Sequence, residues 1–254
     1  AWFLPHYFDR GLPTAYAYLG ERFGSRMRVA AALTFMVTRL LGDGVRLFAT
    51  AIPIKVVLAA AGVEASYPAI LAVIGLVTVA YTMLGGLKAV VWTDVVQMSV
   101  YITGGILTAV TLLDSLPSGW SATASAAGKL QVLDFELGES FVTVLTSPYS
   151  FVTAVVGGAV FTLASHGVDQ IIVQRLLACR DRRDATRALV TSGLIVIAQF
   201  ALFLWIGVLL WAHHGGASLE GLGVSRADEI FPRFVISGLP AGVSGLLLAA
   251  IGLY

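Results

Sequence analysis

The sequence predicts an all-α fold, a polytopic bundle of transmembrane helices in a single domain. Hydrophobic residues make up 57% of the 254-residue chain and charged residues only 12%, whereas a soluble domain carries about 25% charged residues. The apolar stretches approach the roughly 20 residues that a helix needs to cross a bilayer. They are neither short nor alternating, as the strands of a membrane barrel would be. Helices are therefore expected, because each helix satisfies its own backbone polar groups in lipid.

Six apolar stretches are predicted spans. They lie at about 29–59, 67–85, 90–113, 148–173, 188–212 and 239–254. The chain starts at AWFLPHYF without an initiator Met and stops inside an apolar run, and it shows neither the charged start nor the cleavage site of a signal peptide. We therefore expect residues 1–254 to be an internal part of a longer protein, with residues 1–5 ending an earlier span.

The distribution of charge predicts the direction of each span. Arginines cluster before the first full span (Arg10, Arg22, Arg26, Arg28) and after the fourth (Arg175, Arg180, Arg182, Arg183, Arg187). Basic loops face the cytoplasm by the positive-inside rule. The segments 114–147 and 213–238 are not basic, so they are predicted to be extracytoplasmic excursions. A tight cytoplasmic turn is expected at Gly85-Gly86, next to Lys88.

Other features of the composition exclude several classes of protein. A net charge of +1 gives no reason to expect a nucleic-acid partner, and the single cysteine, Cys179, excludes an internal disulfide and any cysteine-based metal cluster. The chain contains no Ser-His-Asp order, Gly-rich phosphate loop or HExxH motif. The sequence therefore does not predict an enzyme.

The first full span contains three charged side chains at helical spacing. Arg39 and Asp43 are four residues apart, and Asp43 and Arg46 are three apart, so all three can share one helix face. They form either a structural ion cluster that holds the helix against its neighbours or one wall of a polar solute cavity. Charges inside a membrane usually face a bundle interior or each other, which is compatible with both hypotheses.

Asp94 is the one carboxylate in the apolar run that follows GGLK. It lies about one turn into the predicted span at 90–113. An acid near the N-terminus of a helix is stabilised by the helix dipole, and Trp92 and Thr93 would then only frame the membrane interface. A role in ion passage explains the same placement, so spacing alone leaves both hypotheses open.

The fourth span contains the densest group of polar side chains. Gly157-Gly158 lies mid-span, and Gly167 precedes a cluster that also includes His166, Asp169 and Gln170. Glycines at these places make a helix break or a close approach a candidate, and broken helices form solute and ion sites in secondary transporters. A lone interior histidine is more often a satisfied structural residue, and a His-Asp pair without a third ligand is a weak metal site.

Three segments of the chain resemble the sodium:solute symporter family, which contains the sugar, proline, monocarboxylate and sialic acid symporters. YTMLGGLKAVVWTDVVQ is similar to the family's specific motif, and SHGVDQIIVQRLLACRD is similar to its Gly-x-(Asn/Asp/Thr)-Gln-x-x-x-Gln-Arg segment. AYLGERFGSRMR resembles the family's loop before the helix that begins at about residue 29. The similarity covers nearly the whole chain, in order.

The resemblance implies a LeuT-like inverted-repeat fold with sodium and solute near the membrane midplane. It places Asp94, with Thr93 beside it, near the inner sodium exit, and it places Asp169 and Gln170 beside the solute pocket. His166, Arg39 and Asp43 complete the candidate pocket residues, although a histidine at position 166 is not usual in the family. Most of the main sodium site is expected outside residues 1–254.

The resulting hypothesis is a sodium-coupled symporter that imports a small polar solute by alternating access, with sodium as its coupling ion and no other cofactor. A small carboxylate or other polar metabolite is favoured because Arg39 and Arg46 lie within a span, and the expected partners are sodium, the solute and the lipid bilayer. The alternative is a membrane sensor in which the same helices are fused to a cytoplasmic signalling domain. The chain has only three lysines (Lys55, Lys88, Lys129) and no asparagine, a bias typical of GC-rich bacterial genomes, so a multi-pass protein of a bacterial inner membrane is expected.

Overall fold

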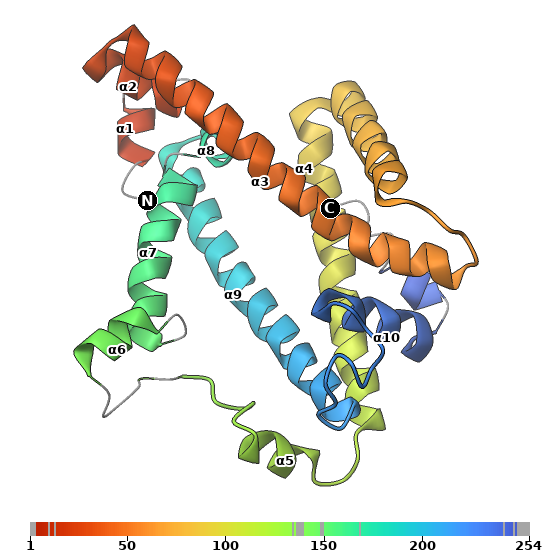
Figure 1. The fold of residues 1–254 in the computed structure, drawn as a ribbon. Helices are drawn as coiled ribbons and strands as arrows, with labels where there is room; N and C mark the ends of the chain where they lie inside the picture. The colour runs from red at the N-terminus through yellow and green to blue at the C-terminus, as the bar shows by residue number, and fades with distance from the viewer. Residues whose placement is uncertain are drawn as a thin grey trace. The chain divides into compact units, whose positions relative to one another are not determined.

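The computed structural model describes residues 4–9, 11–12, 14–133, 135, 140–147, 150–167, 169–240, 242–245 and 247. Of the residues in these ranges 80% are helical, and none lies in a strand. The helices are α1 (Leu4–Phe8), α2 (Ala15–Phe23), α3 (Ser25–Ala60), α4 (Tyr67–Ser115), α5 (Trp120–Ala126), α6 (Phe141–Thr146), α7 (Phe151–Gly167), α8 (Gln170–Leu177), α9 (Arg182–His213), the 3-10 turn η1 (Ala227–Glu229) and α10 (Ile230–Gly238) (Figure 1). They fall into two compact units.

The first unit comprises Ala1–Leu40 and Leu130–Ile197. It contains α1, α2, α6, α7, α8 and the first parts of α3 and α9. Two small apolar clusters hold α1 and α2 against α8 and α9, and their buried members are Tyr7, Leu12, Ala15 and Val173 in one and Leu4, Leu176 and Ala185 in the other. Thr14 begins α2, because its Oγ1 accepts a hydrogen bond from the Ala17 N–H at 3.0 Å.

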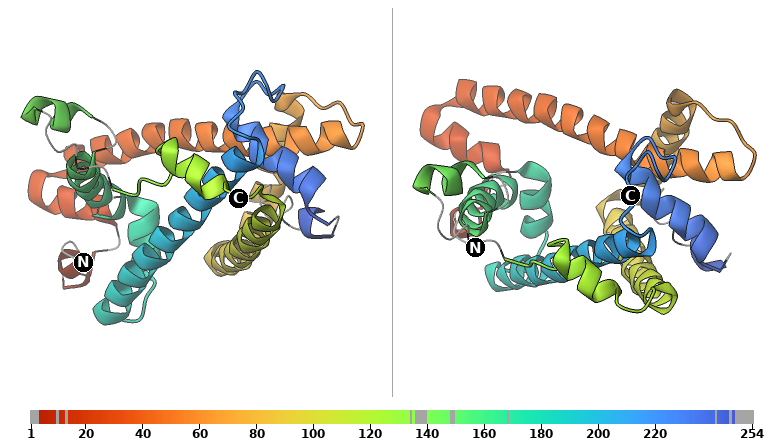
Figure 2. Two further views of the ribbon diagram at one scale, coloured as in Figure 1. Left: turned by 90° about the horizontal axis from the view of Figure 1, so that it is seen from below. Right: turned by 60° about the horizontal axis from the view of Figure 1, so that its bottom comes forward.

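The second unit comprises Leu41–Lys129 and Ala198–Tyr254. Its main apolar cluster joins the C-terminal ends of α4 and α9 to α10 through Ala109, Leu112, Ile206, Leu209, Leu210 and Phe234. Figures 1 and 2 show the ends of α4 and α9 meeting in this region. Leu112 and Leu209 have no exposed surface, so apolar packing fixes the two helices at this end.

Helix α4 is two helices joined at Gly86. This residue has φ 59° and ψ −164°, a conformation that costs little only for glycine. A Cβ on Gly85 would collide with Cβ of Ala89, so glycine is needed at that position as well. In Figure 1 the chain reverses at this point. The reversal occurs where the sequence predicts a tight turn.

Among the residues that the structure describes, three helices are long and apolar enough to cross a membrane: Tyr67–Gly86, Lys88–Ser115 and Arg182–His213. A fourth is obtained if α7 and α8 form one bent span. Helix α3 covers the stretch predicted at 29–59 but is not among these helices, and it carries Arg39, Asp43, Arg46 and Lys55. A span there stays a prediction. Most of the stretch at 239–254, and residues 134, 136–139 and 148–149 in or beside the first excursion, lie outside the described residues.

Candidate solute and ion site

A sharp bend between α7 and α8 builds the centre of the candidate site in the first unit. Helix α7 ends at Gly167, α8 begins at Gln170, and their axes differ by 62°. The glycine pair Gly157-Gly158 lies inside α7 without interrupting it. Of the two glycine positions at which the sequence predicts a possible break, only Gly167 therefore lies at one.

Asp169 begins α8 after the bend. One carboxylate oxygen, Oδ1, accepts hydrogen bonds from the backbone N–H groups of Ile171 at 2.9 Å and Ile172 at 3.4 Å. These are N–H groups that have no partner within the helix, and a carboxylate there is also stabilised by the helix dipole. Asp169 therefore has a structural task that the family resemblance alone does not reveal.

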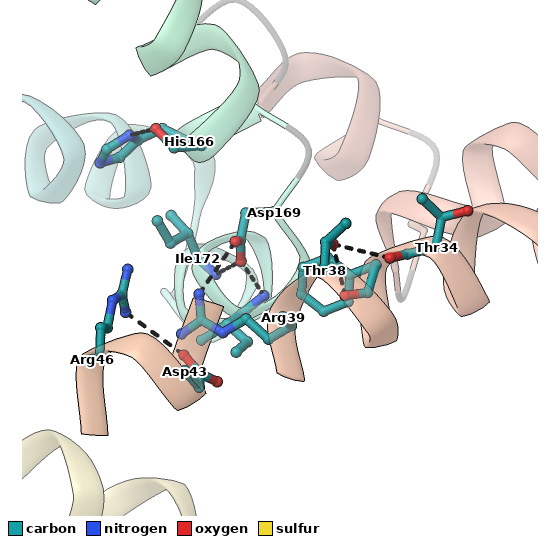
Figure 3. A network of polar contacts seen from close by, with 11 residues as sticks. Thr34, Thr38, Arg39, Asp43, Arg46, His166, Asp169 and Ile172 are labelled. Carbon is teal, nitrogen blue, oxygen red and sulfur yellow. Dashed lines mark hydrogen bonds and ion pairs between the residues drawn. The ribbon is translucent and has the colours of Figure 1, made fainter. Parts of the chain in front are cut away.

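The second oxygen of Asp169 faces a cation from another helix. Arg39 of α3 places Nη1 3.6 Å from Asp169 Oδ2 (Figure 3), and the side chains are 29% and 19% exposed. Two candidate residues that are 130 positions apart in the sequence are thus brought together. Asp43 lies one turn further along α3, in the second unit, where Arg46 Nη1 lies 3.9 Å from its Oδ1.

Helices α1 and α2 are tied to the bend by two further hydrogen bonds. The Tyr7 hydroxyl donates to the Gly167 carbonyl at 2.8 Å, and the Ala15 N–H donates to Gln170 Oε1 at 2.9 Å. Tyr7 is 5% exposed, so its bond supplies a partner to a carbonyl at the end of α7 within a buried environment. The sequence does not predict this role of Tyr7, because no local motif marks a side chain that bonds a carbonyl 160 residues away.

Tyr16 of α2 adds a buried hydroxyl near the same carboxylate. Its oxygen has no hydrogen-bond partner among the described residues. Burial, with smaller contributions from the charges of Asp169 and Tyr7, raises the pKa of Tyr16 to about 12. The phenol is therefore protonated at neutral pH. Its ring packs against Phe35 of α3, with ring centroids 5.7 Å apart.

His166 is half-buried at the end of α7. Its Nδ1 lies 2.9 Å from Ser165 Oγ, the contact drawn in Figure 3. Within the described part of the chain, no three His, Cys, Asp or Glu side chains are grouped so as to hold a metal ion. The His166-Asp169 spacing thus gives no three-ligand site of this kind there.

Asp94 and Thr93 belong to the second unit and are both half-buried. Asp94 is the seventh residue of the helix Lys88–Ser115, about two turns from its start. The field of a helix terminus falls off within the first turn, so helix-end electrostatics explains Asp94 poorly. One turn further on, Gln97 is only 7% exposed, and a polar side chain buried at that depth extends the polar face that Asp94 begins.

A sequence model of the sodium:solute symporter family matches residues 1–252. The chain belongs to this family. It is 34% identical to sodium-coupled monocarboxylate transporter 2 of Danio rerio and 32% identical to the sodium/iodide cotransporter of Homo sapiens, over 97% of this chain in each case. It is 27% identical to the sodium/sialic acid symporter NanT of Aliivibrio fischeri over 98% of this chain. The chain spans 39%, 38% and 48% of the lengths of these three relatives.

A solved structure supports the same family assignment. The substrate-bound outward-open state of a Na⁺-coupled sialic acid symporter aligns with a TM-score of 0.69 and 25% identity, over 99% of this chain and 51% of that one. The predicted all-α, LeuT-like fold class is thereby confirmed. The relatives named above and the protein in this solved structure are all sodium-coupled transporters. Together with the apolar helices, the family makes this chain a multi-pass membrane protein.

Proposed function

We propose that the protein is a sodium-coupled symporter that imports a small polar solute by alternating access, and that the solute is a small carboxylate. The observation that carries the proposal is the bent α7-α8 pair with Arg39 and Asp169 beside the bend. Broken helices present backbone and side-chain polar groups to solutes and ions in secondary transporters. The named solutes of the three relatives, a monocarboxylate, iodide and sialic acid, are anions at neutral pH.

Arg39 is the side chain proposed to recognise the solute carboxylate. A guanidinium offers two parallel N–H groups to a carboxylate, which fixes the orientation of the ligand as well as attracting its charge. The distance from Arg39 Nη1 to Asp169 Oδ2 is 3.6 Å, which is longer than a close charged hydrogen bond. Gln170 and His166 are proposed to supply further polar contacts around the solute, while Asp43, in the second unit, stays a prediction from the sequence.

Asp94 and Thr93 are proposed to line the inner path of sodium. Sodium is a hard cation that prefers oxygen ligands, and a carboxylate compensates for part of the hydration that the ion loses. Sodium bound from outside would stabilise the outward-open state and raise the affinity for solute, and solute would raise the affinity for sodium by the same factor. We place the transporter in a bacterial inner membrane, surrounded by lipid.

The test is uptake by the full-length protein in proteoliposomes. Radiolabelled pyruvate, propionate, sialic acid and iodide are each offered with an inward sodium gradient, and then with an equal potassium gradient. We expect accumulation of at least one carboxylate with sodium only. Equal accumulation in the two gradients for every probe would refute sodium coupling, and sodium-driven uptake of iodide alone would refute the carboxylate assignment.

A further inference from the structure

A pocket of about 540 Å³ lies in the second unit, and its described lining includes none of the residues assigned to solute and sodium above. It is lined by the last turns of α3, the first residue of α4, the end of η1 and one face of α10. Figure 2 shows α10 and the C-terminal part of α3 in two views. Its volume is within the range of about 300–1,000 Å³ typical of small-molecule sites.

Two cations from different helices line the pocket. Lys55 of α3 is half-buried, with Nζ 4.2 Å from the centroid of the Tyr67 ring. Arg233 of α10 places Nη2 3.0 Å from Glu229 Oε2 and donates from Nη1 to the Gly223 carbonyl at 3.3 Å. Because Glu229 is the only carboxylate among the described lining residues, they carry one more positive charge than negative charge.

The rest of the lining is apolar with two hydroxyl groups. Ile52, Val56 and Ile236 supply aliphatic surface, while Tyr67 and Ser237 each bring a hydroxyl. A cation held over an aromatic ring keeps its N–H groups available on the side away from the ring. The combination suits a small molecule with one anionic end and a short apolar body.

We infer that this pocket is a second solute site that binds small monocarboxylates through Lys55 and Arg233. By the predicted topology it lies on the extracytoplasmic side of the protein. Its role would be to raise the local concentration of anionic solute before import, and this role rests on the proposed symport function. Binding itself depends only on the charges and shape of the pocket, and it therefore requires neither sodium nor transport.

The test uses the full-length protein in lipid nanodiscs, in potassium buffer without sodium. Sulfo-NHS-acetate acylates accessible amines, and mass spectrometry gives the acylation rate of each lysine separately. Lys129 is the matched control, because its Nζ also lies over an aromatic ring, 5.8 Å from that of Trp211, and it does not line the pocket. Propionate is the probe, and propionamide is its uncharged analogue at constant ionic strength.

We expect propionate to slow acylation of Lys55 about two- to fivefold, as for a partly exposed ion pair, and to leave Lys129 unchanged. Propionamide should give no protection. Glu229→Gln should strengthen the protection, because the carboxylate no longer competes for Arg233, while Arg233→Gln should weaken it. Three results would each overturn the inference. They are equal protection by propionamide, equal slowing of Lys129 acylation by propionate, and no protection of Lys55 in the protein without substitutions.

The outcome is separable from that of the uptake assay. Protection of Lys55 without sodium-driven uptake would leave the pocket assigned and remove the symporter proposal. Sodium-driven uptake without protection of Lys55 would support the symporter proposal and remove the pocket assignment. Since the first measurement is made on the protein without substitutions, a variant that fails to fold does not decide the result.

Discussion

Asp169 performs two tasks with its two oxygens, and a pair of substitutions separates them. Asp169→Asn keeps an Oδ1 acceptor for the N–H groups of Ile171 and Ile172 but removes the charge that faces Arg39. Asp169→Ala removes both interactions. The difference between the two variants therefore measures the helix cap, and the effect of the asparagine measures the ion pair.

The expected magnitudes follow from the exposure of the groups. Arg39 and Asp169 are 29% and 19% exposed, so the loss of their ion pair should lower the free energy of unfolding by roughly 0.2–1 kcal/mol. Loss of an N-cap costs roughly 0.5–2 kcal/mol. Asp169→Ala should thus be the more destabilising change by about the value of the cap.

The measurement is chemical unfolding of the full-length protein in detergent micelles, followed by tryptophan fluorescence. Asp181→Ala is the matched control, because Asp181 Oδ1 accepts from the Asp184 N–H at 2.8 Å at the start of α9, outside the candidate site. Uptake in proteoliposomes gives the second readout. Asp169→Asn should lower KM for the transported carboxylate, because the Asp169 charge no longer competes for Arg39, whereas Asp181→Ala should leave KM unchanged.

Two results would refute this account of Asp169. If Asp169→Asn destabilises the protein as much as Asp169→Ala, the cap contributes nothing and the charge is the whole effect. If Asp169→Asn and Arg39→Gln have independent effects on KM that add in the double variant, the two side chains do not act as a unit. In that case the ion pair has no part in solute binding.

Three further predictions concern other parts of the chain. Asp94→Asn should weaken the sodium activation of uptake more than it lowers maximal solute binding, and unchanged sodium activation, as expected for the control Asp114→Asn, would remove Asp94 from the ion path. Gly86→Ala should lower the free energy of unfolding by roughly 1–2 kcal/mol, because alanine is strained at φ 59°, while Gly157→Ala, within a regular helix with open space around it, should not lower it, because alanine is favoured over glycine inside a helix. Tyr16 has a pKa raised to about 12 in the folded protein against 10.0 ordinarily, so the folded state should lose stability between about pH 10 and pH 12 as the unfolded chain releases this proton first. Tyr16→Phe should reduce that loss in unfolding measurements across this pH range, and an identical alkaline profile would contradict the assignment.

Local features of the fold were predictable because their causes are local. The break at Gly86 follows from two adjacent glycines and a lysine between apolar runs, and the stretches at 67–85 and 90–113 fall within the two apolar helices on either side. The first predicted span differs from these two. Its stretch is helical as expected, but the charges of Arg39, Asp43, Arg46 and Lys55 make it more polar than the helices long and apolar enough to cross a membrane.

The site was predictable only as a set of residue types. Helical spacing connects Arg39 with Asp43 because they are one turn apart, but it carries no information about Asp169, whose approach depends on how α3 packs against α8. The same reason hides the bond from Tyr7 to Gly167. Family resemblance indicated Asp169 and Gln170, and the structure adds that both hold backbone N–H groups of helices α8 and α2.

The two carboxylate oxygens of Asp169 have different partners, and this bears on how a solute would be exchanged. If Arg39 turns from Asp169 Oδ2 to an incoming carboxylate, the contact at 3.6 Å between the two side chains is lost. The bonds from Oδ1 to α8, and those of Tyr7 and Gln170 to the bend and to α2, do not involve Arg39. Solute binding and release can therefore change the partner of Arg39 while the geometry of the bend is kept. A site built in this way exchanges one ion pair for another of similar strength, which favours a solute that is released as readily as it is bound.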